Sequence, residues 1–183
     1  MDNFAEISES TLRDILQWSF ENTKIMKAKN KMGKTIIHYA ANKGCVPLMK
    51  KLIGDGVEIN SKDNSGITPL HLAAKSGNIE IAKLLLECNA VVDSRDIQDW
   101  TPLFFASQSG DTEMAKLLIS DGANVNFESK VKETPLFLAS KSGNSELVKL
   151  LIEKGSNITC KLKNLVTPLH FSSLNGHTQG KLL

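Results

Sequence analysis

Three histidines recur at a fixed interval, and histidine is the side chain most often used for proton transfer near neutral pH. His38 and His71 lie 33 residues apart, and His170 follows at three times that interval. A catalytic histidine needs one special setting, whereas these three share one place in a repeated pattern that reads Thr-Pro-Leu-His at residues 68–71. We therefore expect these imidazoles to hydrogen-bond near helix starts, and we interpret His177 as structural in the same way.

A second candidate is Gly33-Lys34-Thr35, which resembles the end of a phosphate-binding P-loop. That motif requires a glycine five residues before its last glycine, and the sequence has Ala28 there. Thr35 also belongs to the repeated pattern. The sequence therefore predicts no nucleotide site at this position.

The cysteines give no metal-binding pattern. Cys45, Cys88 and Cys160 are widely separated, form no CxxC pair, and have no histidine at zinc-ligand spacing. The fold could still bring a cysteine and a histidine together, but nothing in the sequence indicates an activated thiol. We predict reduced thiols, no enzyme activity, no metal and no cofactor.

The composition favours a folded protein without a strong charge-based partner. Hydrophobic residues make up 41% of the 183 residues, charged residues 23%, and the net charge is +2. Only two of the 22 basic residues, Arg13 and Arg95, are arginine, which argues against nucleic-acid recognition. Because the N-terminus is not a secretory signal and no apolar run could span a membrane, we expect an intracellular protein, cytoplasmic or nuclear and not secreted.

The histidines belong to a repeat of 33 residues that holds across five copies without slippage. Threonine marks one column and glycine another. The threonines are Thr35, Thr68, Thr101, Thr134 and Thr167, and the glycines are Gly44, Gly77, Gly110, Gly143 and Gly176.

Each unit predicts two short helices. Threonine followed by proline is typical of a helix start, because the hydroxyl accepts a backbone N–H and proline has none to leave unpaired. The glycine that follows this first helix supplies the left-handed residue that ends it. A second helix reads IEIAKLLLE at residues 79–87, and Asn89 closes it where other copies have glycine. The apolar columns predicted to face the core are Leu48, Ile81, Met114 and Leu147, with Leu52, Leu85, Leu118 and Leu151.

These motifs resemble the ankyrin repeat, which has this period and a T-P-L-H-x-A signature. The resemblance implies an all-α solenoid of stacked antiparallel helix pairs with β-hairpin-like loops, in one continuous domain. It also implies a non-catalytic module that binds another protein through loop tips and a concave face. The predicted parts are an N-terminal cap at 1–29, repeats at 30–62, 63–95, 96–128 and 129–161, and a partial repeat at 162–183.

The positions that differ between copies are the candidates for partner binding, because the repeated columns are fixed by the scaffold. Large aromatic residues on a surface are frequent anchors of interfaces. Trp100 falls at a loop position near Ile97, and phenylalanine replaces histidine at two positions of the His column. We therefore hypothesise a binding patch; the alternative is that both phenylalanines pack between repeats. The candidate residues are Ile97, Trp100, Phe104 and Phe137, with Ile67, Lys75, Gln108 and Lys141 around them.

Two local patterns carry further expectations. The segment Asp63-Asn64-Ser65-Gly66 is a good tight turn, whereas its counterparts end in Asp99, Lys132 and Leu165, so we expect the later tips to depart from this geometry. Glutamate and lysine recur three residues apart on the second helices, as in Glu113 and Lys116, which predicts solvated ion pairs.

Three other functions remain open from the sequence. The chain could be a regulatory fragment of a larger, enzymatic protein. It could associate with itself through Phe171, Leu174, Leu182 and Leu183 near the C-terminus. A nucleic-acid binder would instead use the lysines near the N-terminus, which are Lys24, Lys27, Lys29, Lys31 and Lys34.

Overall fold

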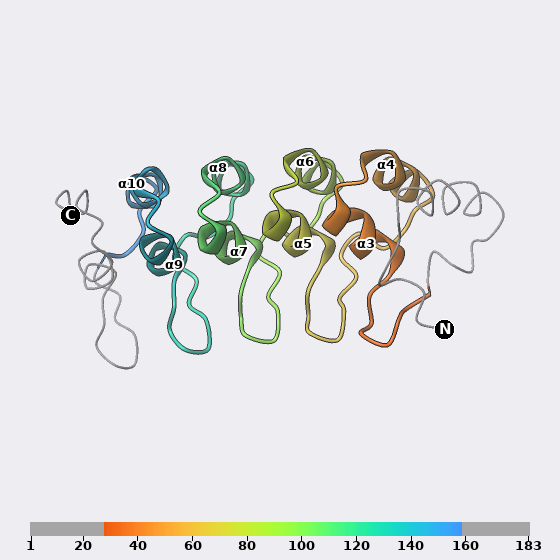
Figure 1. Cartoon of the computed structure of the whole chain (residues 1–183), viewed down its shortest axis with the longest axis horizontal. Helices are drawn as coiled ribbons and strands as arrows, with labels where there is room; N and C mark the ends of the chain where they lie inside the picture. Colours follow the sequence, from red (N-terminus) through yellow and green to blue (C-terminus); the bar gives the residue numbers. More distant parts are fainter. Residues whose placement is uncertain (1–27, 159–183) are drawn as a thin grey trace. The chain divides into compact units, whose positions relative to one another are not determined.

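The computed structural model describes residues 28–158, and over this range the chain forms eight helices and no strand. The chain divides into two compact units, Met1–Val91 and Val92–Leu183, which we call unit 1 and unit 2. In the described part of each unit, two pairs of antiparallel helices alternate with long hairpin loops (Figure 1). The prediction of an all-α fold with hairpin-like loops is confirmed.

Unit 1 contains four of these helices. An inner layer is formed by α3 (Ile36–Lys43) and α5 (Pro69–Ser76), and an outer layer by α4 (Val46–Gly54) and α6 (Ile79–Glu87). The hairpins project from the inner helices (Figure 1). Neighbours pack within each layer, α3 on α5 and α4 on α6, so each repeat buries its apolar face against the next one.

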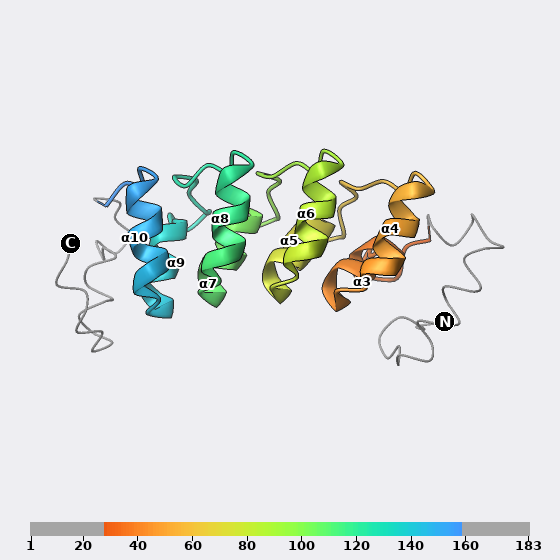
Figure 2. The same cartoon turned by 90° about the horizontal axis from the view of Figure 1, so that it is seen from above.

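Unit 2 repeats this arrangement. Its inner helices are α7 (Pro102–Ser109) and α9 (Pro135–Ser142), and its outer helices are α8 (Thr112–Ser120) and α10 (Ser145–Glu153). Viewed from above, the outer helices of a unit lie side by side, α4 next to α6 and α8 next to α10 (Figure 2).

The helix boundaries follow from the residues that the repeat fixes. Each inner helix starts after a threonine in extended conformation, and Thr68 and Thr134 accept a hydrogen bond from the third residue of their helix. Each inner helix ends at a left-handed glycine, such as Gly44 at φ 68°. Asn89 has φ 62°, which confirms that asparagine takes the left-handed place of glycine after α6.

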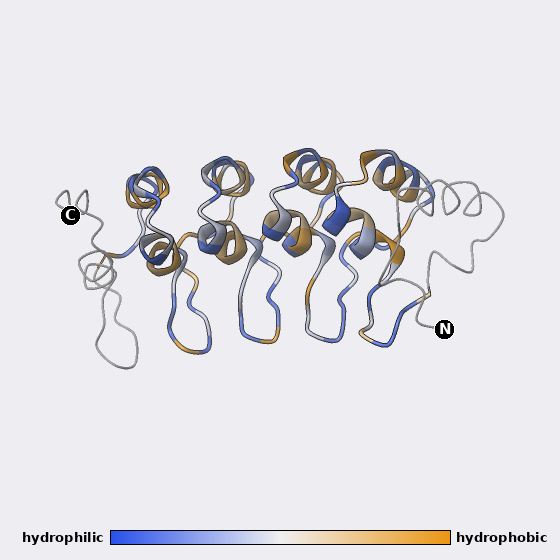
Figure 3. Cartoon of the chain, viewed as in Figure 1, coloured by the Kyte–Doolittle hydropathy of each residue, from blue (hydrophilic) through white to orange (hydrophobic). Residues whose placement is uncertain are grey.

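The core lies between the two layers. All eight members of the two predicted apolar columns are buried, from Leu48 to Leu151. Hydrophobic residues are concentrated in the helices, whereas the hairpins are largely hydrophilic (Figure 3). The hairpins are therefore the natural place for residues that contact solvent or a partner.

The hairpin turns keep one geometry in both units. Their last residue is left-handed at Gly33 and Gly66, both with φ 76°, and also at Asp99, with φ 62°, and Lys132, with φ 69°. The expectation that the later tips depart from this geometry is wrong at these two positions. The reason is that an Asp or Ser side chain at the turn start accepts backbone N–H groups and holds the turn closed, as Asp96 does from Gln98 (2.8 Å) and Trp100 (2.9 Å).

Several predictions concern residues beyond the described range. The N-terminal cap up to residue 27, most of the partial fifth repeat, Leu165, His170, His177 and the C-terminal apolar residues proposed for self-association all lie there. The exact repeat boundaries and the single continuous domain stay predictions.

Candidate functional site

The two described histidines are buried at the starts of the inner helices of unit 1. The Nδ1 atom of His38 accepts from the backbone N–H of Thr35 at 3.2 Å and lies 2.9 Å from the Thr35 hydroxyl. Because Nδ1 is an acceptor, the proton of the neutral ring lies on Nε2, which donates to the carbonyl of Ile67 at 3.0 Å. His71 makes the same pair of contacts with Thr68, at 3.1 and 2.8 Å.

This environment favours the uncharged ring. Burial lowers the pKa of His38 below its ordinary value of 6.5, and the hydrogen bond to the Ile67 carbonyl and the charge of Asp63 oppose that shift only in part. The prediction that these imidazoles hydrogen-bond at helix starts is confirmed for both residues. Through Nε2, His38 also connects the start of α3 to the backbone of the next hairpin at Ile67.

Phenylalanine occupies the equivalent column in unit 2, and both residues belong to the core. The exposed fraction is 0% for Phe104 and 3% for Phe137, and the two pack in one cluster with Leu138. The hypothesis that these two side chains lie on a binding surface is therefore wrong. The column points inwards, and an apolar ring fills the space that the hydrogen-bonded histidines fill in unit 1.

Trp100 is half-buried and packs on that cluster. Its ring is stacked on Phe104, with centroids 5.7 Å apart, and meets Phe105 edge-on at 5.3 Å. Such aromatic pairs add about 0.5–1.5 kcal/mol beyond their buried area. The indole therefore anchors the hairpin to α7, and only part of it faces solvent.

Two exposed apolar residues of unit 2 lie at the hairpin tips. Ile97 and Val131 each expose 51% of their surface, and a hydrogen bond of 3.0 Å from the Lys130 N–H to the Gln98 carbonyl connects the two tips. Gln108 and Lys141 are exposed at the ends of α7 and α9. In unit 1, Lys75 is exposed and Ile67 is half-buried.

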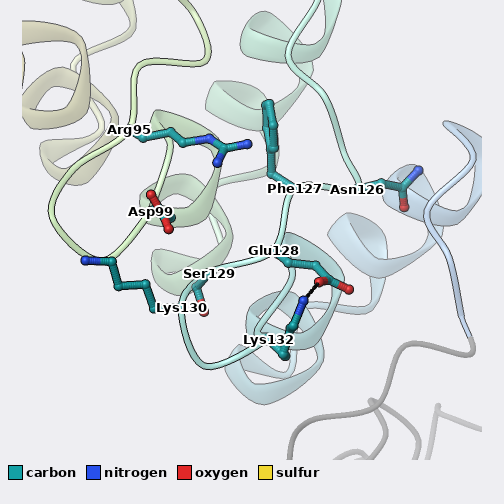
Figure 4. A pocket seen from close by; sticks show the side chains of 8 residues that line it. All are labelled: Arg95, Asp99, Asn126, Phe127, Glu128, Ser129, Lys130 and Lys132. Carbon is teal, nitrogen blue, oxygen red and sulfur yellow. Dashed lines mark hydrogen bonds and ion pairs between the residues drawn. The ribbon is translucent and has the colours of Figure 1, made fainter.

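A cleft between these two hairpins was not predicted. It has a volume of about 480 Å³, and Arg95 lies over the ring of Phe127 at its edge, with the guanidinium carbon 4.3 Å from the ring centroid (Figure 4). Lys132 and Glu128 form an ion pair of 2.6 Å in its lining. The only sequence signal was Arg95, one of two arginines in the chain. The lining residues are Arg95, Asp99, Asn126, Phe127, Glu128, Ser129, Lys130 and Lys132.

On the outer helices one of the predicted ion pairs forms within a helix, that of Glu113 with Lys116. Lys116 lies 2.8 Å from Glu113 on α8 and 3.1 Å from Glu146 on α10, and hydrogen bonds to both carboxylates raise the pKa of the Lys116 ammonium. The pairing is therefore between repeats as well as within a helix. Because these groups are exposed, they contribute little to stability.

Within residues 28–158, no group of three or more potential ligands could hold a metal ion, and Cys45 and Cys88 are free thiols that are partly buried. No helix in the same range is long and apolar enough to cross a membrane.

Comparison with known families agrees with the geometry. A family model described as ankyrin repeats in three copies matches residues 6–96, 37–129 and 103–182. The chain belongs to the ankyrin repeat family. A search of curated proteins finds no match to it. Ankyrin repeats are generally protein–protein interaction modules and are typically not enzymes.

Proposed function

We propose that this chain is a non-catalytic scaffold or adaptor that binds another protein through its hairpin tips and inner helices. The observation that carries the proposal is the exposure of Ile97 and Val131 on two neighbouring, hydrogen-bonded hairpins. Half-exposed branched aliphatic residues at the tips of polar loops have no role in the core of the unit. They offer apolar area to a partner.

Contacts that hold these hairpins in place support the same proposal. Trp100 stacks on Phe104 of α7, and Arg95 of one hairpin stacks on Phe127 of the next, so the hairpins are held to a helix and to each other. A surface that is ordered before binding loses less conformational entropy when the partner arrives. The proposed contact residues in unit 2 are therefore the tips, the accessible part of Trp100, Gln108 and Lys141.

Unit 1 offers equivalent positions. Lys75 ends α5 with its side chain exposed, and Ile67 lies half-buried before the helix start. We include both as contact residues. The proposed repeat boundaries follow the 33-residue interval of the sequence. The proposed setting is intracellular, in the cytoplasm or nucleus.

The test is affinity capture from a cell extract with the full chain as bait. The variant Ile97→Asn/Val131→Asn removes apolar area at the two tips without touching the core. The matched control is Val91→Asn/Ile158→Asn, because these residues are similarly exposed but lie in connectors outside the hairpin tips. We expect the tip variant to lose a partner that the wild type and the control both retain. Equal capture by all three baits would contradict the proposed site.

A further inference from the structure

Lysines gather on the inner layer of unit 1. We define this layer as the hairpins at 28–35 and 61–68 with helices α3 and α5, as seen in Figure 1. It contains six lysines and one acidic residue, Asp63, so its net charge is +5 with histidine neutral. The lysines are Lys29, Lys31, Lys34, Lys43, Lys62 and Lys75.

The outer layer of the same unit does not share this charge. Helices α4 and α6 and the connectors that follow them, at 54–60 and 88–91, carry three lysines and four acidic residues, a net charge of −1. Ion pairs form there, with Lys51 at 3.0 Å from Asp55 and Lys50 at 3.7 Å from Glu80. Within residues 28–91 the positive charge of unit 1 therefore belongs to one layer.

The inner layer of unit 2 provides an internal comparison. Its equivalent residues, 94–109 and 127–142, carry four basic and four acidic side chains and a net charge of zero. The shared scaffold therefore does not require an excess of lysine, and the charge of unit 1 is a property of its variable positions.

The lysines are accessible to a partner. Five of the six are exposed, and Lys34 is half-buried. The acidic Asp63 faces its own turn, where its Oδ1 accepts from the N–H groups of Ser65 at 2.8 Å and Ile67 at 3.0 Å. Met32 lies among the lysines at the first hairpin tip with 65% of its surface exposed, and methionine adapts readily to an apolar partner.

We propose that the inner layer of unit 1 binds an acidic polypeptide segment of the partner, with an apolar residue of that segment against Met32. The proposal rests on the proposed function and adds the chemistry of the partner. Opposite charge across an interface raises the association rate and selects the partner, because a basic or neutral segment gains nothing from the six lysines.

A polypeptide fits this surface better than a nucleic acid does. All six cations are lysines, whereas phosphate and base-edge recognition favour the arginine fork. Single-stranded nucleic acid also needs exposed aromatic rings for stacking, and the only aromatic residue in this described layer is Tyr39, which is half-buried with Lys43 6.0 Å from its ring centroid.

The test measures binding of three fluorescent probes to the full chain by anisotropy across a salt series. The first probe is an acidic 15-residue peptide built from glutamate, leucine and serine in alternation. The second is the same peptide with glutamine in place of every glutamate. The third is a single-stranded oligonucleotide with the same net charge as the acidic peptide. We expect the acidic peptide to bind, the neutral peptide to bind at least about tenfold more weakly, and the affinity for the acidic peptide to fall as salt rises.

Two charge-matched variants locate the site. Lys29→Gln/Lys62→Gln/Lys75→Gln changes the inner layer of unit 1, and Lys83→Gln/Lys149→Gln/Lys154→Gln removes the same charge from exposed positions on outer helices and their ends. We expect the first variant to weaken binding of the acidic peptide about tenfold or more and the second less than about threefold. Circular dichroism confirms that both remain folded.

The proposal is overturned if both variants lose equal affinity, because the effect is then one of net charge. It is also overturned if the oligonucleotide binds more tightly than the peptide, if no peptide binds, or if the salt-sensitive event is self-association in sedimentation. If capture of a partner depends on Ile97 and Val131 but the acidic peptide does not bind, the proposed function is retained and only this inference is rejected.

Discussion

The hydroxyl of Thr35 lies 2.9 Å from Nδ1 of His38, and an equivalent hydroxyl in unit 2, that of Thr101, is buried without a hydrogen-bond partner among the described residues. Phe104 stands where unit 1 has histidine, so the imidazole partner is missing. The Thr101 hydroxyl also does not accept from its helix, whereas the Thr134 hydroxyl accepts from the N–H of Phe137 at 3.2 Å. A buried hydroxyl without a partner costs about 1–3 kcal/mol. The same repeated threonine is therefore stabilising at Thr35 and costly at Thr101.

We predict opposite effects of one substitution at these two places. Thr101→Val removes the unpaired hydroxyl and is expected to raise the free energy of unfolding by about 0.5–1 kcal/mol. Thr35→Val, the matched change, breaks the contact with His38 and is expected to lower the free energy of unfolding by about 1 kcal/mol. Chemical denaturation measures both, and a loss of equal size in the two variants would contradict this account.

The buried imidazole of His38 predicts that stability depends on pH. Because burial lowers the pKa of His38, the unfolded chain binds more protons than the folded protein at pH values below about 6.5. The stabilising contribution is therefore complete above about pH 6.5 and decreases as the pH falls towards the lowered folded-state pKa. Denaturation of wild type and His38→Phe between pH 7.5 and 5 should show a shallower decline for the variant. A steeper decline of stability for His38→Phe than for the wild type would contradict a lowered pKa of His38.

The turn at Lys132 should tolerate glycine better than lysine. A side chain at φ 69° crowds its own backbone, so Lys132→Gly is expected to raise the free energy of unfolding by about 0.5–1 kcal/mol. The lost ion pair with Glu128 is exposed and contributes little. Lys130→Gly is the control, because Lys130 is in the same turn without a positive φ and should lose stability. Destabilisation of Lys132→Gly by more than about 0.5 kcal/mol would contradict the prediction.

Two glycines of unit 1 should differ in their response to alanine. Both have positive φ, 76° at Gly33 and 71° at Gly56, so both substitutions strain the backbone. A Cβ at Gly33 would also lie 2.8 Å from the backbone nitrogen of Asn64 on the neighbouring hairpin, whereas a Cβ at Gly56 meets no described atom within 4 Å. We expect Gly33→Ala to cost at least about 1 kcal/mol more than Gly56→Ala in thermal or chemical denaturation. Equal costs would show that the hairpins do not approach each other so closely.

The sequence predicted the parts of the fold that depend on local chemistry. Threonine before proline, a left-handed glycine or asparagine, and apolar residues four positions apart each act within one helix or its cap, and Thr68, Asn89 and Leu85 lie as expected. The imidazole contact of His38 was predictable for the same reason, since its partner is three residues away.

The site was less predictable, because exposure depends on packing between repeats. Phe104 is in the column of His71, and only its neighbours in three dimensions show that this column faces the core. The stacking of Arg95 on Phe127 joins residues 32 positions apart, and no pattern within one repeat indicates it. The turn geometry at Asp99 and Lys132 was not predicted, because an Asp or Ser side chain at the start of the turn holds it closed without a glycine.

The central claim is that the hairpin tips of this ankyrin repeat protein bind another protein. The most direct measurement is the dissociation constant of a captured partner for the wild-type chain, for Ile97→Asn/Val131→Asn and for Val91→Asn/Ile158→Asn, by isothermal titration calorimetry. We predict that the tip variant weakens binding by about tenfold or more and that the control stays within about twofold of the wild type. Equal affinity of the tip variant and the wild type would contradict the claim.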